Sequence, residues 1–270
     1  MSDPASREQT FFCTDGGQLC YFISGKGQPV VLIHGLGLDA SMWKPQWPVL
    51  QDEFRAIRYD LRGFGASTVP TGPYSHSEDL FALLDSLEAR PAHLVGLSMG
   101  GHIALRFVLE HPNSARSLTL IDSALEGYSW SEAWARSMGA IVSAARSGDA
   151  HAAKQLWLAH ELFAPARREA GRAAALAAMI ERYSAWHWRN ADPARKAERR
   201  AIEVLRAVAC PALVIVGELD LPDFQTIARR LAAEIPGAKL VTVAGAGHMA
   251  NMEAPAAVNE LLLAHLRAHV

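Results

Sequence analysis

The sequence has few cysteines, no long hydrophobic run and almost no excess of charge of either sign. Its 270 residues include three cysteines, an odd number without CxxC spacing, which fits neither a disulfide framework nor a zinc site. The net charge of −2 excludes a strongly basic surface for nucleic acid or anionic lipid. No apolar run approaches the roughly 18 residues of a membrane span, and the polar N-terminus lacks the apolar core of a signal peptide. We therefore expect a cytoplasmic protein, monomeric or homodimeric, that binds neither nucleic acid nor membrane.

Two of the cysteines fall in a predicted hairpin. The stretches 11–14 and 19–24 flank an Asp-Gly-Gly turn signal, a combination typical of a β-hairpin. If the two glycines form a two-residue loop, Cys13 and Cys20 lie directly across the ladder from each other. We expect these cysteines, and Cys210, to be reduced small hydrophobic residues; a cross-strand disulfide is the alternative.

Apolar runs and helical spacing alternate along most of the chain. Strands are predicted at 30–33, 54–59, 94–95, 118–121, 212–216 and 240–243. Helices are predicted at 99–110, 223–235 and 256–268. A further helix is predicted to begin at Ser75, where Ser75 and Glu78 have the spacing of a capping box, and to stop before Pro91. Strands that alternate with helices imply right-handed crossovers and a mostly parallel sheet, which the hairpin at the start makes mixed.

The alternation breaks once, between residues 124 and 205. This stretch is rich in Ala, Arg and Glu, has helical periodicity without a strand-like run, and carries five of the seven tryptophans. We predict an all-helical insertion at 124–205 on an α/β core formed by 1–123 and 206–270. Both ends of the insertion follow carboxyl ends of strands, the face where such sheets bind ligands, so the insertion is placed to cover a site.

Residues 96–100 have the form G-x-S-x-G and lie between an apolar strand and a helix. A sharp turn there would hold Ser98 in a strained conformation with its hydroxyl projecting, and glycines remove side chains that would collide. The N–H of Met99, at the helix N-terminus, is then aimed at the oxyanion that forms when Ser98 attacks a carbonyl. The Leu36 N–H, in the loop 34–37, is the candidate second donor; the alternative is a glycine loop that merely turns the chain.

A serine hydroxyl is a weak nucleophile unless a base activates it. In the chain order Ser, acid, His, the acid follows a later strand and the histidine lies near the C-terminus. Asp220 follows the strand at 212–216, and His248 follows the strand at 240–243. We predict that His248 takes the proton from Ser98 and that Asp220 orients the imidazole and stabilises its charged form.

Three other histidines compete with the predicted base: His34, His93 and His102. The first is expected to shape the predicted oxyanion loop through hydrogen bonds, and the second to begin a strand. The third lies one helical turn past Ser98 and remains an alternative base. Asp122 and Glu218 compete with Asp220, which is preferred because it follows the later strand in the expected order.

Five elements in this order resemble the α/β-hydrolase family, in its capped esterase, lactonase and carbon–carbon hydrolase branch. In chain order they are His34-Gly35, residues 60–67 (DLRGFGAS), residues 96–101, residues 217–220, and Gly247-His248-Met249 with Glu253 and Pro255. The resemblance implies an α/β fold with an eight-stranded, mostly parallel mixed sheet, helices on both faces and an inserted all-helical cap. It implies no cofactor and no metal. Residues 36–39 and Trp43 are also similar to enol-lactonases, although those carry a different dipeptide where His34-Gly35 stands.

Residues 35–40 offer a rival interpretation, because they match G-x-G-x-x-A after a strand and Asp60 ends the next strand. That pattern is typical of dinucleotide-binding sites. However, His34 stands where a small or apolar residue is usual, the chain already starts with a hairpin, and the predicted triad is left without a role. We therefore expect Asp60 and Arg62 to tie a loop together by ionic hydrogen bonds instead.

The sequence thus predicts a serine hydrolase that cleaves a small, largely apolar carboxylic ester or lactone through an acyl-enzyme on Ser98. One alternative is hydrolysis of a carbon–carbon bond in ring-fission diketone acids, where Arg182 or Arg189 would meet the substrate carboxylate. Another is a ligand receptor on a hydrolase fold. Of the tryptophans in the insertion, Trp157 and Trp186 are expected to line the substrate pocket.

Overall fold

The computed structural model describes residues 9–270, which are built around one sheet of eight strands in the order β1-β2-β4-β3-β5-β6-β7-β8. The strands are β1 Thr10–Thr14, β2 Gly17–Ser24, β3 Pro29–Ile33, β4 Arg55–Tyr59, β5 Ala92–Leu97, β6 Ala115–Ile121, β7 Ala212–Gly217 and β8 Lys239–Val243. The β1–β2 and β2–β4 pairs are antiparallel, and every other neighbouring pair is parallel. The predicted mixed, mostly parallel sheet is confirmed.

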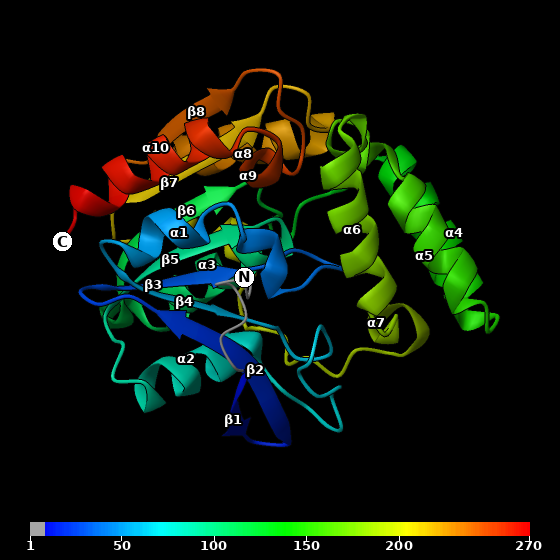
Figure 1. Ribbon diagram of the computed structural model, residues 1–270, viewed down its shortest axis with the longest axis horizontal. Helices are drawn as coiled ribbons and strands as arrows, with labels where there is room; N and C mark the ends of the chain where they lie inside the picture. The colour runs from blue at the N-terminus through cyan, green and yellow to red at the C-terminus, as the bar shows by residue number, and fades with distance from the viewer. Residues whose placement is uncertain (1–8) are drawn as a thin grey trace, which may run out of the picture.

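Helices cover both faces of this sheet (Figure 1). On one face lie α1 (Trp47–Gln51) and α10 (Pro255–Arg267), with the short α9 (Ala250–Glu253) before α10. On the other face lie α2 (His76–Ser86), α3 (Met99–Glu110) and α8 (Pro222–Glu234). Ser75 caps α2 by accepting a hydrogen bond from the Glu78 N–H at 3.3 Å, while the Glu78 carboxylate pairs with His111 at 3.1 Å rather than completing a capping box.

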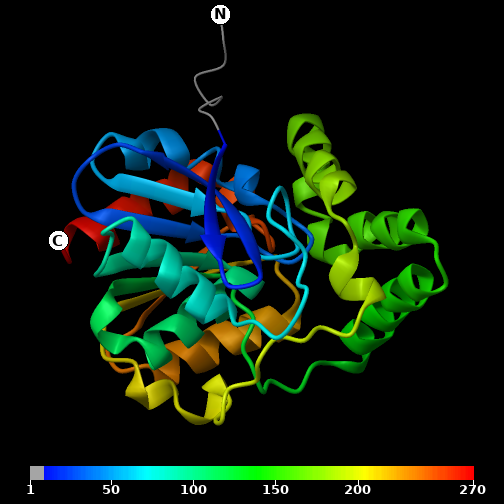
Figure 2. The ribbon, with the colours of Figure 1, turned by 90° about the horizontal axis from the view of Figure 1, so that it is seen from below.

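Between β6 and β7 the chain leaves the sheet and forms α4 (Glu132–Arg146), α5 (Ala150–Ala159), α6 (Ala170–Arg182) and α7 (Trp186–Arg189). These helices lie together beyond the ends toward which the parallel strands run (Figure 2). The four helices therefore lie at the carboxyl edge of the sheet.

The remaining helical elements are short 3₁₀ turns. They are η1 Ala40–Trp43, η2 Pro112–Ser114, η3 Glu161–Phe163, η4 Ala166–Arg168, η5 Ala201–Glu203 and η6 Leu205–Ala207.

The first hairpin differs from the prediction by one residue. Its loop is Asp15-Gly16 rather than the two glycines, and Gly16 has a φ of +75°, which is the conformation that Asp-Gly loops supply. The ladder consequently places Cys13 opposite Gln18 and Cys20 opposite Phe11. The prediction that the two cysteines face each other is wrong, and all three cysteines are free thiols.

The central strand β3 is apolar on both faces. Residues 30–33 of β3 are fully buried, as a strand covered on both sides requires. Within residues 9–270, no helix combines the length and the apolar character needed to cross a membrane.

Candidate active site

Ser98 occupies the turn from β5 into α3. Its φ of 55° and ψ of −116° lie in a region that residues other than glycine rarely adopt. The space around the turn explains the flanking glycines: a Cβ on Gly96 would lie 2.2 Å from the Gly100 oxygen, and one on Gly100 would lie 2.1 Å from the Ile33 oxygen. The Ser98 N–H donates to the Ile121 carbonyl at 3.0 Å, so β6 helps to hold the strained conformation.

His248 and Asp220 form a buried pair at the ends of β8 and β7. The imidazole Nδ1 lies 2.9 Å from one carboxylate oxygen and 3.1 Å from the other. An ionised carboxylate only accepts, so the ring carries its proton on Nδ1 and leaves Nε2 free as a base. Burial lowers the pKa of His248 to about 4, which keeps the imidazole neutral at pH 7.

Ser98 and His248 line the same small cavity, together with Leu36 and Trp157. The space open to the centre of a water molecule is about 10 Å³, which is room for about one water. The Ser98 hydroxyl makes no hydrogen bond to any residue that the structure describes. Catalytic hydrogen bonds often form only when substrate is bound, so the shared cavity is the relevant observation.

The two predicted oxyanion donors remain without acceptors. Neither the Leu36 N–H nor the Met99 N–H donates to a group within residues 9–270. Leu36 lines the cavity, and Met99 opens α3, whose N-terminus carries partial positive charge. The loop at residues 34–37 approaches Ser98 closely, since a Cβ on Gly35 would lie 3.5 Å from the Ser98 Cβ.

The three histidines that compete with His248 for the role of base do not line this cavity. His34 donates from Nδ1 to the Gly35 carbonyl at 2.8 Å and accepts at Nε2 from the Leu61 N–H at 2.9 Å, so it shapes the loop through hydrogen bonds. His93 lies inside β5 and bonds to a serine of β6 at 2.8 Å. His102 lines a different hollow, between α2 and α3.

Asp122 is a second buried carboxyl group beside Asp220. Its Oδ1 accepts from the Gly217 N–H at 2.7 Å, and its Oδ2 accepts from the Ala250 N–H at 3.3 Å. Burial, and then the charge of Asp220, raises the pKa of Asp122 well above its ordinary value. Burial also raises the pKa of Asp220, against the lowering effect of its hydrogen bonds with the Leu221 N–H and with Asp122.

Two further side chains, Glu253 from the motif around His248 and Phe224 from α8, support the histidine. The carboxylate of Glu253 accepts from the backbone N–H groups on both sides of His248. The ring of Phe224 lies 4.2 Å from the imidazole, centroid to centroid. Glu218, the rival acid, instead accepts from the Gly245 N–H at 2.8 Å, so it braces the neighbouring loop.

The two predicted pocket tryptophans are placed differently. Trp157 is buried in the cavity wall, and its indole N–H has no partner within residues 9–270. It packs against the loop at residues 34–37, because a Cβ on Gly37 would lie 2.6 Å from its Nε1. Trp186 does not line this cavity and packs against His187 at 5.0 Å.

Asp60 and Arg62 both tie loops together, as predicted, but through separate partners. Asp60 accepts from the N–H groups of Ala40 at 2.8 Å and Ala66 at 2.9 Å. Arg62 forms a two-pronged ion pair with Asp79, at 2.8 and 2.6 Å. Because backbone donors occupy both oxygens of Asp60, that carboxylate does not serve the dinucleotide interpretation.

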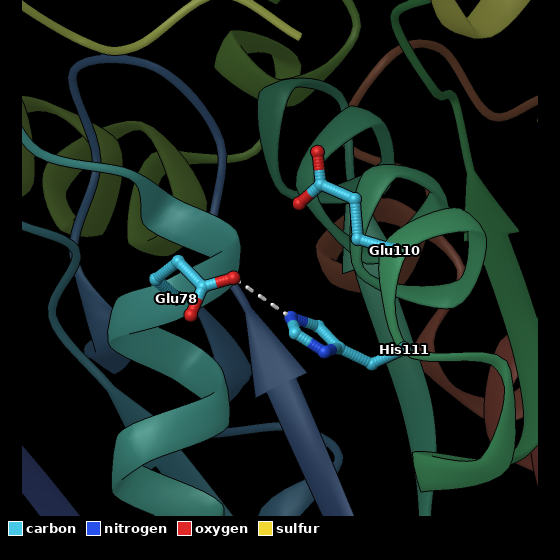
Figure 3. A group of neighbouring side chains, drawn as sticks. All are labelled: Glu78, Glu110 and His111. Atoms are coloured by element: carbon cyan, nitrogen blue, oxygen red, sulfur yellow. Dashed lines mark ion pairs between the residues drawn. The ribbon is translucent and has the colours of Figure 1, made fainter.

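In the part of the chain that the structure describes, one group of three residues brings potential metal ligands together: Glu78, Glu110 and His111 (Figure 3). Their ligand atoms lie within 4.8 Å of one another, and both glutamates are exposed. The group lies at the far end of α3 from Ser98, about 18 Å away by the length of that helix. Any ion bound there would not touch the Ser98 cavity.

Comparisons with known proteins place these features in context. Residues 30–261 match the model of the alpha/beta hydrolase family. The chain is 33% identical to the dihydrolipoyllysine-residue acetyltransferase component of the acetoin cleaving system of Pseudomonas putida, over 94% of this chain and 68% of that protein. The enol-lactonase of Burkholderia xenovorans LB400 superposes with a TM-score of 0.83 at 28% identity, over 96% of this chain and all (100%) of that one. A thermophilic esterase of Thermogutta terrifontis superposes with a TM-score of 0.82 at 29% identity, over 97% and 98%.

Proposed function

Because the chain belongs to the alpha/beta hydrolase family, we propose that it is a serine hydrolase that cleaves a small, largely apolar carboxylic ester or lactone. The observation that carries this proposal is the strained Ser98 in one cavity with the buried His248–Asp220 pair. The similarity to an enol-lactonase and an esterase supports the choice of bond.

The proposed reaction proceeds through an acyl-enzyme. Nε2 of His248 takes the proton of the Ser98 hydroxyl as the oxygen attacks the acyl carbon, and Asp220 stabilises the imidazolium. The N–H groups of Leu36 and Met99 bind the tetrahedral oxyanion. His248 then protonates the leaving alkoxide, activates a water that attacks the acyl carbon, and returns the proton to Ser98 as the acid leaves.

We further propose that residues 124–205 form the cap of this site. They supply Trp157, Leu162 and Phe163 to the cavity wall. Since the cavity has room for about one water, substrate binding requires these side chains to shift outward. The unpartnered indole N–H of Trp157 is then free to donate to an oxygen of the substrate, and the apolar remainder of the lining suits an apolar acyl group.

The environment of the insertion's arginines supports an ester over a diketone acid. A substrate carboxylate would need a cationic partner at the site. Arg182 is paired with Asp39 at 2.6 Å, Arg189 is exposed, and neither lines the Ser98 cavity.

Hydrolysis of a panel of nitrophenyl esters and lactones tests the proposal. The wild type should turn over at least one member with an initial burst of product equal to the enzyme concentration, as an acyl-enzyme requires. Ser98→Ala should lose about six orders of magnitude in kcat. Ser123→Ala, which removes a buried hydroxyl at the neighbouring strand end, is the matched control and should retain activity. A wild type inactive on the whole panel would favour the ligand receptor.

A further inference from the structure

Arg58, in β4, is a buried cation whose guanidinium makes no hydrogen bond to any of residues 9–270. It is 4% exposed, and its Nε and Nη1 are closed off without a partner. No acceptor within residues 9–270 receives any of its five N–H groups. Taking a guanidinium out of water is unfavourable unless new hydrogen bonds replace the lost ones. The structure therefore leaves a set of strong donors unmet at this position.

Two aromatic rings hold this guanidinium in place. Phe22 lies directly opposite Arg58 in the β2–β4 ladder, and its ring centre is 4.9 Å from the Arg58 Cζ. The ring of Trp47, from α1, lies 4.5 Å from the same atom. Such rings stabilise the charge through their faces but do not accept the in-plane N–H groups in the way a carboxylate does. The guanidinium is thus oriented in advance for an anion.

Arg58 faces a cavity of about 550 Å³, which lies between β4, η1 and α6 and is within the size range of small-molecule sites. It shares no lining residue with the Ser98 cavity. Nε and Nη1 are closed off from solvent, so Nη2 is the guanidinium nitrogen left for a ligand in the cavity to meet. The cavity is therefore a separate compartment that a ligand could enter without touching the candidate active site.

The charges around this cavity favour a single negative charge on its ligand. Its charged lining residues are Lys44, Arg58 and Arg182 against Asp39 and Asp60, which leaves one net positive charge. Neither carboxylate is bonded to Arg58, since Arg182 occupies Asp39 at 2.6 Å and backbone N–H groups occupy Asp60. The remaining wall is largely apolar and includes Phe22, Met179 and three alanines.

We propose that this cavity binds a small organic acid. Its carboxylate accepts hydrogen bonds from the Arg58 guanidinium and is attracted by Lys44 at the exposed rim, while its hydrocarbon part lies against Met179 and Phe22. One carboxylate matches the net charge of the lining, whereas a phosphate dianion would exceed it. The proposal does not depend on the hydrolase activity, because the two cavities are separate.

Calorimetric titration of the full chain with benzoate tests this site, with benzamide as the neutral analogue and inorganic phosphate as the competing anion. The wild type should bind one benzoate, and should bind benzamide and phosphate more weakly. Arg58→Gln should weaken benzoate binding by about tenfold or more, since a charge-assisted hydrogen bond is lost. Lys44→Gln should weaken it by a few fold and reduce its salt dependence. Arg55→Gln, at the other end of β4 and outside the cavity, and Ser98→Ala should leave it unchanged.

Three results would overturn the proposal: no saturable benzoate binding to the wild type, equal affinity in the wild type and in Arg58→Gln, or tighter binding of phosphate than of benzoate. Circular dichroism establishes whether Arg58→Gln folds. If it does not, Lys44→Gln decides, because Lys44 is exposed and its replacement leaves the core intact; unchanged benzoate affinity in that variant contradicts the proposal.

Discussion

Opening the packing around His248 should raise its pKa and move the acid limb of the activity profile. Burial is the largest cause of the low value, about 4 against an ordinary 6.5, and the Phe224 ring covers the imidazole at 4.2 Å. Full exposure would therefore shift the limb by up to about 2.5 pH units, toward the ordinary value of a histidine. Phe224→Ala removes this cover, so its limb should lie between 4 and 6.5.

The sign follows from which form of His248 is active. Neutral imidazole is the base, so kcat/KM of the wild type should be constant at neutral pH and fall as the pH drops through about 4. Phe224→Ala should already lose activity near pH 5 relative to its own value at pH 8. The measurement is kcat/KM for a nitrophenyl ester against pH at constant ionic strength.

Two further variants separate the pKa effect from lost stability. Phe224→Ala deletes a buried ring and should cost about 3–5 kcal/mol of folding free energy, whereas Phe224→Leu keeps much of the volume and should move the limb less. Leu231→Ala, buried two turns along the same helix, should lower the melting temperature without moving the limb. A wild-type limb near 6.5, or identical limbs in the wild type and Phe224→Ala, would refute the reasoning.

Three other predictions concern the candidate site and the thiols. Asp220→Asn should lower kcat by about four orders of magnitude, because the amide favours the wrong imidazole tautomer. Asp122→Asn should chiefly lower the melting temperature, since it leaves a backbone N–H unpaired. If kinetics and thermal melts show the opposite pattern, Asp122 is the acid. Trp157→Phe should lower kcat/KM about tenfold for substrates with an additional acceptor oxygen. Trp188→Phe removes an equally unpartnered buried N–H outside the cavity and should not; equal effects would deny Trp157 a role as donor. Titration of the unfolded protein without reductant should find three thiols, as free cysteines require, and a count of one would reveal a disulfide.

The sheet and the Ser98 turn could be predicted because local signals report them. An apolar run, two glycines around Ser98 and a helical repeat lie within residues 92–110, and the structure places β5, the strained turn and α3 there. The same holds for Asp220, three residues after the end of β7, and for His248, five residues after the end of β8. Parallel strands end at one edge of the sheet, so local recognition of each strand end sufficed to bring these residues together.

Contacts between distant segments carry no comparable local signal. Asp122 meets Asp220 across two strand ends, and Phe224 reaches His248 from a helix, so neither contact could be predicted from spacing alone. Arg62 pairs with Asp79 in α2 rather than with a group in its own loop for the same reason. The hairpin shows a second limit, because a shift of one residue in its loop changes every cross-strand partner.

Labelling with a fluorophosphonate tests most directly the claim that His248 activates Ser98. The full chain would be treated with the probe and its modified peptide identified by mass spectrometry. We expect a single label, on Ser98, that forms about a thousandfold more slowly in His248→Ala and is absent from Ser98→Ala. A label on another residue, an equal rate in His248→Ala, or a wild type that stays unlabelled would contradict the account.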